Sequence, residues 1–111
     1  MINIRLVRKN NNFIKLNVYG HSGYDRLGRD IVCAAVSSLV QGVIIGLEEV
    51  ICKDFYYSID DENASVNIDI SKYNEKDLEK AQILFNTFRL TIEKLLLDYR
   101  KYIKMKFEEE Q

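Results

Sequence analysis

The residues of this sequence that could carry covalent catalysis are one histidine and two cysteines. His21 follows Gly20, and Cys33 lies twelve residues further on, at the third position of a long apolar segment. If that segment is a helix, the N–H groups of its first turn and its dipole favour a thiolate at Cys33. His21 could then accept the thiol proton and later protonate a leaving amine, with nearby backbone N–H groups as candidate oxyanion donors.

Two further polar residues flank Cys33. Asp30 directly precedes the apolar segment, where an N-cap residue would stand. Its carboxylate could instead orient His21 or pair with an arginine of the preceding loop, and an unpaired carboxylate there would disfavour the thiolate. Ser37 follows Cys33 by one helical turn, so its hydroxyl could reach a substrate or bond back to the Cys33 carbonyl.

Other interpretations of these residues remain open on spacing alone. A cysteine on an apolar helix is often an inert core residue, and we interpret Cys52, which has no polar partner in view, in this way. A Cys33–Cys52 disulfide would have to span most of a helix, roughly 28 Å at 1.5 Å per residue, which argues against a thiol redox protein. One histidine and two cysteines cannot fill a Cys/His zinc site without carboxylates. We therefore expect no metal and no other cofactor.

The elements that position these residues follow from apolar periodicity. Period-two alternation predicts strands at residues 2–7, 13–19, 55–59, 66–70 and 103–107, although the last could instead continue a helix. Asp30 and Asn74 are N-cap candidates for helices over about 31–51 and 75–99. The segment 22–29, which contains Gly23 and Gly28, has no periodicity and is predicted to be a mobile loop. The prediction is one α+β domain over residues 1–111, ordered β-β-α-β-β-α-β, with a mixed or antiparallel sheet packed against two long helices.

The two helices carry different apolar patterns. The first is apolar nearly all the way round, so we expect it to be buried on several sides, and its row of small residues should let another element pack close. This row consists of Ala34, Ser38, Gly42 and Gly46. The second helix has one core-facing stripe and, on the opposite side, Ile83, Leu90 and Leu97, which are either scattered exposed residues or a dimer contact.

Composition excludes several function classes. The chain has 111 residues, of which 47% are hydrophobic and 30% charged, as expected for one globular domain. Sixteen basic and 17 acidic residues argue against nucleic-acid binding through bulk basic charge. The segment 31–47 is shorter than the ~20 apolar residues of a membrane span. No charged-then-apolar leader is evident, so we expect a cytosolic protein with reduced thiols and no membrane partner.

The segment around His21 and Cys33 resembles a known motif. Gly-His-Ser-Gly at residues 20–23, a short loop, and Gly-Arg-Asp-Ile-Val-Cys-Ala-Ala-Val-Ser at residues 28–37 resemble the ribosomal-processing cysteine protease family, Prp. The length and the order of elements are similar over essentially the whole chain. One departure is Ser22, because alanine is usual after the histidine.

The resemblance implies a bacterial cytoplasmic endopeptidase. Such an enzyme removes a short N-terminal extension from large-subunit ribosomal protein twenty-seven by cutting after an aromatic residue. Cys33 takes the position of the nucleophile and His21 that of the general base. The resemblance also implies that other motif positions support the site or the substrate, that the protein is a homodimer, and that the glycine-bearing loop rearranges on substrate binding. These supporting positions are Gly20, Gly23, Gly28, Asp30 and Ser37.

The alternative function is a non-catalytic, ribosome-associated module that binds peptide or assists assembly. The intact His21–Cys33 pair argues against it, because a pure binder does not need both residues. We expect an apolar groove beside Cys33, for which Tyr19, Tyr24 and Leu27 are candidates by proximity in sequence. Local acidic residues, either Asp25 or the run 60–62, could meet a basic ribosomal protein, although such a run is more often a solvated turn.

Overall fold

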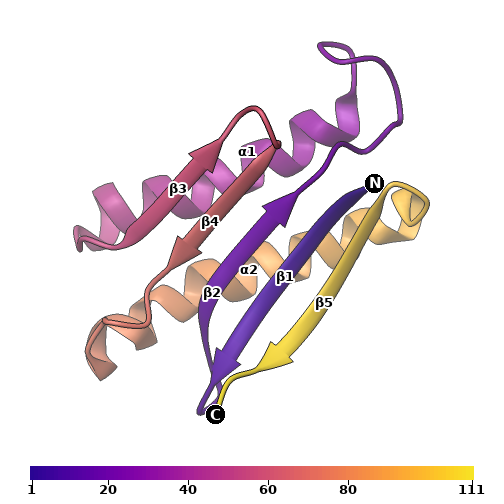
Figure 1. The fold of residues 1–111 in the computed structure, drawn as a ribbon. Coiled ribbons are helices and arrows are strands. Elements are labelled where there is room, and N and C mark those ends of the chain that lie inside the picture. Colours follow the sequence, from indigo (N-terminus) through magenta and orange to yellow (C-terminus); the bar gives the residue numbers. More distant parts are fainter.

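Five strands form one mixed sheet in the computed structural model, which describes residues 1–111 (Figure 1). The strands lie in the order β3-β4-β2-β1-β5, and all neighbours are antiparallel except β1 and β5, which are parallel. Their bounds are β1 Ile2–Lys9, β2 Asn12–Tyr19, β3 Tyr56–Asp60, β4 Ser65–Asp69 and β5 Ile103–Glu109. The predicted order of elements is confirmed, the sheet is mixed rather than antiparallel, and the last segment is a strand.

Both helices cover the same face of the sheet (Figure 1). Helix α1 (Ile31–Ile45), continued by a π-helical turn η1 (Gly46–Ile51), connects the parallel strands β2 and β3, and helix α2 (Glu75–Tyr99) connects the parallel strands β4 and β5. The two connections run in opposite directions across the sheet and leave strands of opposite direction. Right-handed crossovers therefore place both helices on one face.

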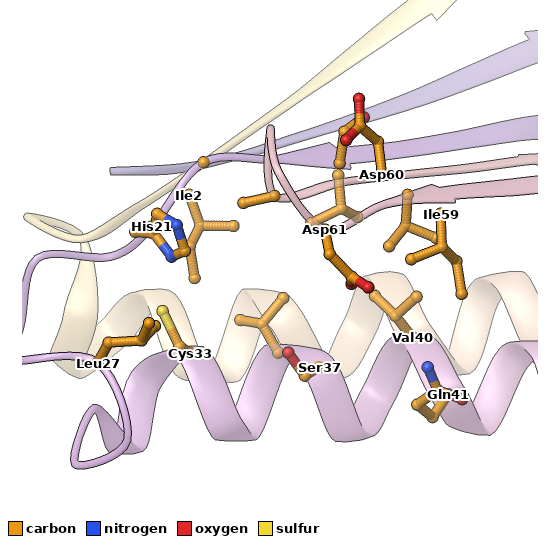
Figure 2. A pocket seen from close by; sticks show the side chains of 16 residues that line it. Ile2, His21, Leu27, Cys33, Ser37, Val40, Gln41, Ile59, Asp60 and Asp61 are labelled. Atoms are coloured by element: carbon orange, nitrogen blue, oxygen red, sulfur yellow. The ribbon is translucent and has the colours of Figure 1, made fainter.

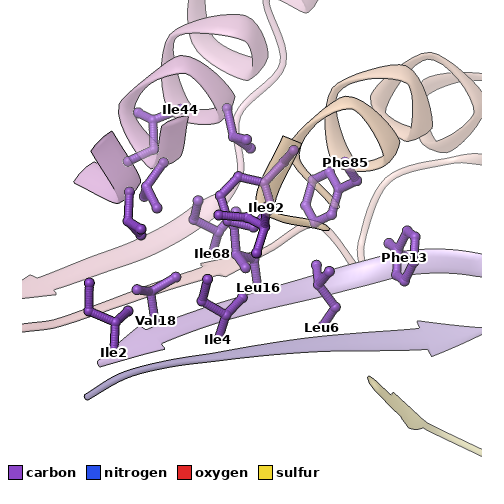
Figure 3. Packing of buried hydrophobic residues seen from close by; sticks show 14 of the residues in the cluster. Ile2, Ile4, Leu6, Phe13, Leu16, Val18, Ile44, Ile68, Phe85 and Ile92 are labelled. Carbon is purple, nitrogen blue, oxygen red and sulfur yellow. The ribbon is translucent and has the colours of Figure 1, made fainter. Parts of the chain in front are cut away.

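The core lies between this sheet face and the helices (Figure 3). Alternation along β1 turns Ile2, Ile4 and Leu6 inward, and Phe85 and Ile92 of α2 belong to the same cluster on the helix side. Nineteen buried apolar residues join one cluster, to which α1 contributes Val32, Val36, Val40, Val43 and Ile44. Because this core is continuous from β1 to both helices, it holds the start of α1 firmly against the sheet.

Helix α1 differs from the prediction in two ways. Only one of its faces is buried, and Ile31 and Ile45 are 55% and 49% exposed. Of the small-residue row, Gly46 alone is closely packed: a Cβ there would lie 2.6 Å from Cδ1 of Leu84 on α2. The rest of the row, Ala34, Ser38 and Gly42, faces solvent. The valines already fill the single layer between α1 and the sheet, and no second layer covers the outer face.

The segment Ile31–Ile51 is helical for 21 residues and has the length and apolar composition of a membrane span. In this fold its valine face packs on the sheet, and 39% of the apolar window is buried. On α2, Ile83, Leu90 and Leu97 point outward and are exposed. Their use as a dimer contact stays a prediction.

Candidate active site

An apolar groove runs between α1 and the β3–β4 hairpin (Figure 2). The cavity has a volume of about 270 Å³. Its walls are mainly aliphatic and come from both the helix and the sheet, including Ile2, Val18, Val36, Val40, Ile59 and Val66. His21 and Cys33 lie at one end of this groove, so an extended apolar peptide in it would pass the sulfur.

His21 reaches the groove because the chain turns sharply after β2. Gly20 has φ +96°, and a Cβ at this position would lie 2.5 Å from the Met1 carbonyl oxygen. Its N–H donates to the Ala64 carbonyl at 3.0 Å, which ties the turn to the β3–β4 hairpin. Only glycine combines this backbone angle with so close an approach. The turn therefore fixes where the exposed His21 ring enters the groove.

Cys33 lies in the first turn of α1, half-buried and facing His21. Figure 2 shows the His21 ring directly above the Cys33 sulfur, with Leu27 on the outer side. The Ser22 backbone N–H donates to Cys33 Sγ at 3.3 Å. A donor aimed at the sulfur stabilises negative charge on it, as does the first turn of the helix.

Asp30 is the N-cap of α1. It is 7% exposed, and its Oδ1 accepts the Cys33 N–H at 2.9 Å. Its Oδ2 accepts the Ser22 hydroxyl and the backbone N–H groups of Tyr24 and Asp25, at 3.2 and 3.4 Å for the two N–H groups. Burial raises the pKa of Asp30, but these hydrogen bonds, first that of Ser22, outweigh it and lower the pKa to about 2.

The alternatives for Asp30 are thereby resolved in this structure. The carboxylate caps the helix and bonds the loop, and it forms neither an ion pair with Arg26 or Arg29 nor a hydrogen bond with His21. Four donors surround it, so its negative charge is partly compensated close to the sulfur.

The loop over 22–29 is anchored at one end and free at its tip. The Tyr24 ring packs edge-on against Tyr99 and Tyr102, with centroids 5.9 and 5.2 Å away. Gly23 and Gly28 have φ of +75° and +90°, which permits the tight course of the loop. Leu27, which is 80% exposed, lines the groove beside Cys33. Of the three groove candidates, the structure therefore places only Leu27 in the groove.

The far end of the groove is more polar. Ser37 and Gln41 follow Cys33 along the groove side of α1, where the Ser37 hydroxyl has no hydrogen-bond partner within the protein. Asp60 and Asp61, from the predicted acidic run, line the groove from the hairpin. Hydrogen bonds from Asn63 lower the pKa of Asp60. Asp25 is absent from the groove lining.

The groove walls are the residues that sequence reasoning missed. Cys33, Ser37 and Gln41 are spaced by four, so the helical period alone could have put Gln41 on the helix face that carries Cys33. Ile59 and Val66 reach the groove through pairing of β3 with β4, which gives no local signal. No group of three or more His, Cys, Asp or Glu side chains is arranged to hold a metal ion.

Comparison with known proteins supplies the family. Residues 1–104 match the family described as cysteine protease Prp. The fold is similar to SMU.848 from Streptococcus mutans (30% identity, TM-score 0.86, covering 99% of this chain and 96% of that one). It is also similar to the ribosomal processing protease Prp from Staphylococcus aureus with a covalently linked product peptide (19% identity, TM-score 0.85, covering 97% and 100%).

A second structure of the Staphylococcus aureus protease, with a substrate peptide, has 17% identity and a TM-score of 0.82, and covers 97% of this chain and 100% of that one. No curated protein matches this sequence. The family match spans nearly the whole chain and includes the groove end where His21 and Cys33 face each other. This chain belongs to the Prp family of cysteine proteases.

Proposed function

We propose that this protein is a ribosomal-protein processing endopeptidase in which Cys33 is the nucleophile and His21 the general base and acid. The observation that carries the proposal is their meeting at one end of an apolar groove in a member of a cysteine protease family. The Staphylococcus aureus relatives were solved with a substrate peptide and with a covalently linked product peptide. A peptide substrate suits the open, elongated groove.

The proposed chemistry is acyl transfer through a thioester. The Cys33 thiolate attacks the scissile carbonyl carbon, and the carbonyl oxygen becomes an oxyanion. His21, protonated by the thiol, gives its proton to the departing amine, which leaves as the C–N bond breaks. His21 then takes a proton from water, the resulting hydroxide attacks the thioester, and the carboxylate product leaves with regeneration of the thiolate.

The hydrogen bonds around Cys33 limit the choice of oxyanion donor. The Cys33 N–H is held by Asp30 Oδ1, so it is not free for a substrate in this arrangement. The Ser22 N–H contacts Cys33 Sγ and lies beside the reacting atom. This N–H bonds the sulfur while the sulfur carries the negative charge. When attack moves that charge to the carbonyl oxygen, the N–H is released to the oxyanion, so it is the donor that we assign there. No third side chain forms a hydrogen bond with His21, so we propose a Cys-His dyad rather than a triad.

The proposed substrate is the short N-terminal extension of large-subunit ribosomal protein twenty-seven, cut after an aromatic residue. An aliphatic groove suits apolar residues next to the scissile bond. Asp60 and Asp61 at the groove's far end add negative charge that suits a basic ribosomal protein. We further propose that the protein acts as a homodimer in the bacterial cytoplasm, where both of its free cysteines would remain reduced.

The dyad is tested with Cys33→Ala and His21→Ala against a peptide that spans a phenylalanine-containing extension. Each variant should lose cleavage, whereas Cys52→Ala, which changes an exposed free cysteine far from the groove, should retain it. Full cleavage by either dyad variant would refute the mechanism. A thiol reagent should also modify Cys33 much faster than Cys52 at neutral pH. Equal, slow labelling would favour a non-catalytic peptide-binding module.

A further inference from the structure

A closed ring of hydrogen bonds joins Ser22, Asp30 and Cys33. The Ser22 hydroxyl donates to Asp30 Oδ2, the Cys33 N–H donates to Asp30 Oδ1 at 2.9 Å, and the Ser22 N–H donates to Cys33 Sγ at 3.3 Å. The Tyr24 N–H also donates to Ser22 Oγ, at 3.1 Å. Ser22 is 4% exposed, so water does not compete for these bonds.

We propose that Ser22 is a positioning residue for the reaction: its hydroxyl, held by Asp30, fixes the Ser22 N–H against the Cys33 sulfur and compensates the carboxylate beside it. This inference rests on the proposed function and deepens it. Ser22 directly follows His21, so the same ring also fixes the backbone that carries the His21 ring over the sulfur.

The ring stabilises the Cys33 thiolate in two ways. The Ser22 N–H donates to the sulfur, and this donor is lost if the residue moves. The Ser22 hydroxyl donates to the Asp30 carboxylate, whose charge acts against a neighbouring thiolate when it is not compensated. Removal of the hydroxyl therefore works against the thiolate through both effects.

The change Ser22→Ala removes one oxygen atom and leaves the buried methylene in place. The Tyr24, Asp25 and Cys33 N–H groups still hold the carboxylate. We therefore expect a folded protein with a graded defect rather than an inactive one.

The test measures iodoacetamide alkylation of Cys33 against pH, in a Cys52→Ser background where Cys33 is the only thiol. Ser22→Ala should slow alkylation at pH 7 by about threefold to tenfold and move the alkylation profile to higher pH, because a donor to a charged group is lost. It should lower kcat for the peptide and leave KM within about twofold. Ser22→Thr, which keeps the hydroxyl, should retain the original profile. Ser38→Ala, on the exposed face of α1, is the matched control.

Other charged and titratable groups around Cys33 also influence how its alkylation rate depends on pH. They are His21 at the end of β2, Asp30 at the cap, Asp25, Arg26 and Arg29 in the loop, and Asp60 and Asp61 on the hairpin. Repeating Ser22→Ala in an Asp30→Asn background shows whether Ser22 acts through its hydrogen bond to Asp30. If Ser22 acts through Asp30, its replacement should have little further effect on the alkylation rate there.

Three outcomes would overturn the proposal. They are an unchanged profile in Ser22→Ala, an equal shift in Ser22→Thr, and an undiminished effect of Ser22→Ala in the Asp30→Asn background. A merely structural role would lower the fraction of protein that reacts without moving the pH profile of the remainder. If the unmodified protein is alkylated rapidly but cleaves no peptide, the proposed function fails while the alkylation data still decide the role of Ser22.

Discussion

Asp30→Asn perturbs the carboxylate on which the start of α1 depends. Asparagine keeps one acceptor oxygen, which can still cap the Cys33 N–H. Its amide group replaces Oδ2 and turns N–H donors toward the Ser22 hydroxyl and the Tyr24 and Asp25 N–H groups, which are donors themselves. Ser22 and Asp30 are buried, so water does not readily replace the lost acceptor oxygen, and of these donors the Tyr24 N–H alone keeps a second acceptor, Ser22 Oγ.

The expected loss of folding stability in Asp30→Asn follows from the pKa of Asp30. It is lowered from its usual 3.8 to about 2, and this difference corresponds to about 2 kcal/mol of folding stability at neutral pH. The folded protein binds a proton less readily than the unfolded chain. The stabilisation is therefore fully present above pH 3.8 and is lost as the pH falls through about 2.

Urea unfolding of the wild-type protein and Asp30→Asn between pH 7 and pH 3 measures this contribution. We expect Asp30→Asn to be less stable by about 2 kcal/mol at pH 7 and by about half that amount at pH 3. Asp98→Asn removes an exposed carboxylate on α2 and should change stability by less than about 0.5 kcal/mol. A stability difference that is independent of pH, or below about 0.5 kcal/mol at pH 7, would refute this account of Asp30.

Three further substitutions test the elements around the site. Gly20→Ala should cost more than about 2 kcal/mol in urea unfolding, because φ is +96° and the new Cβ meets the Met1 carbonyl; an unchanged midpoint would contradict this. Gly46→Ala should cost about 1 kcal/mol from overpacking against Leu84, and Leu84→Ala should relieve that cost in the double variant. Leu27→Ala should leave stability within about 0.5 kcal/mol but raise KM for an apolar peptide, and an unaltered KM would exclude Leu27 from substrate contact.

Local patterns in the sequence predicted the elements because each pattern has a local cause. Alternation in β1 follows from one buried sheet face, and Asp30 and Asn74 both cap helices through a side-chain oxygen that accepts an N–H three residues later. The strand ends differ by one or two residues from prediction. Parallel pairing with β1 extends β5 to Glu109, whereas the pairing of β3 with β4 shifts both of these strands by one residue.

For helix α1, the burial predicted from the sequence pattern differs from the burial found in the structure. Apolar residues all round it predicted burial on several sides, yet the single-layer arrangement offers it one partner face. The composition of the helix shows that it is apolar, but it does not show how many other elements the topology places against it. The same holds for the small-residue row: Leu84 of α2 packs against Gly46, whereas nothing lies within 4 Å of a Cβ built at Gly42.

For Asp30, the local sequence correctly predicted the helix cap but not the hydrogen bonds that surround its carboxylate. The cap could be predicted, because it needs only the residue type and the start of an apolar segment. The sequence could not decide whether the carboxylate charge disfavours a thiolate at Cys33. That outcome depends on donors from Ser22, Tyr24 and Asp25, which reach it only once the loop folds back over the helix end. The negative charge of Asp30 beside Cys33 is compatible with the proposed thiolate chemistry because the loop, rather than an arginine, compensates it.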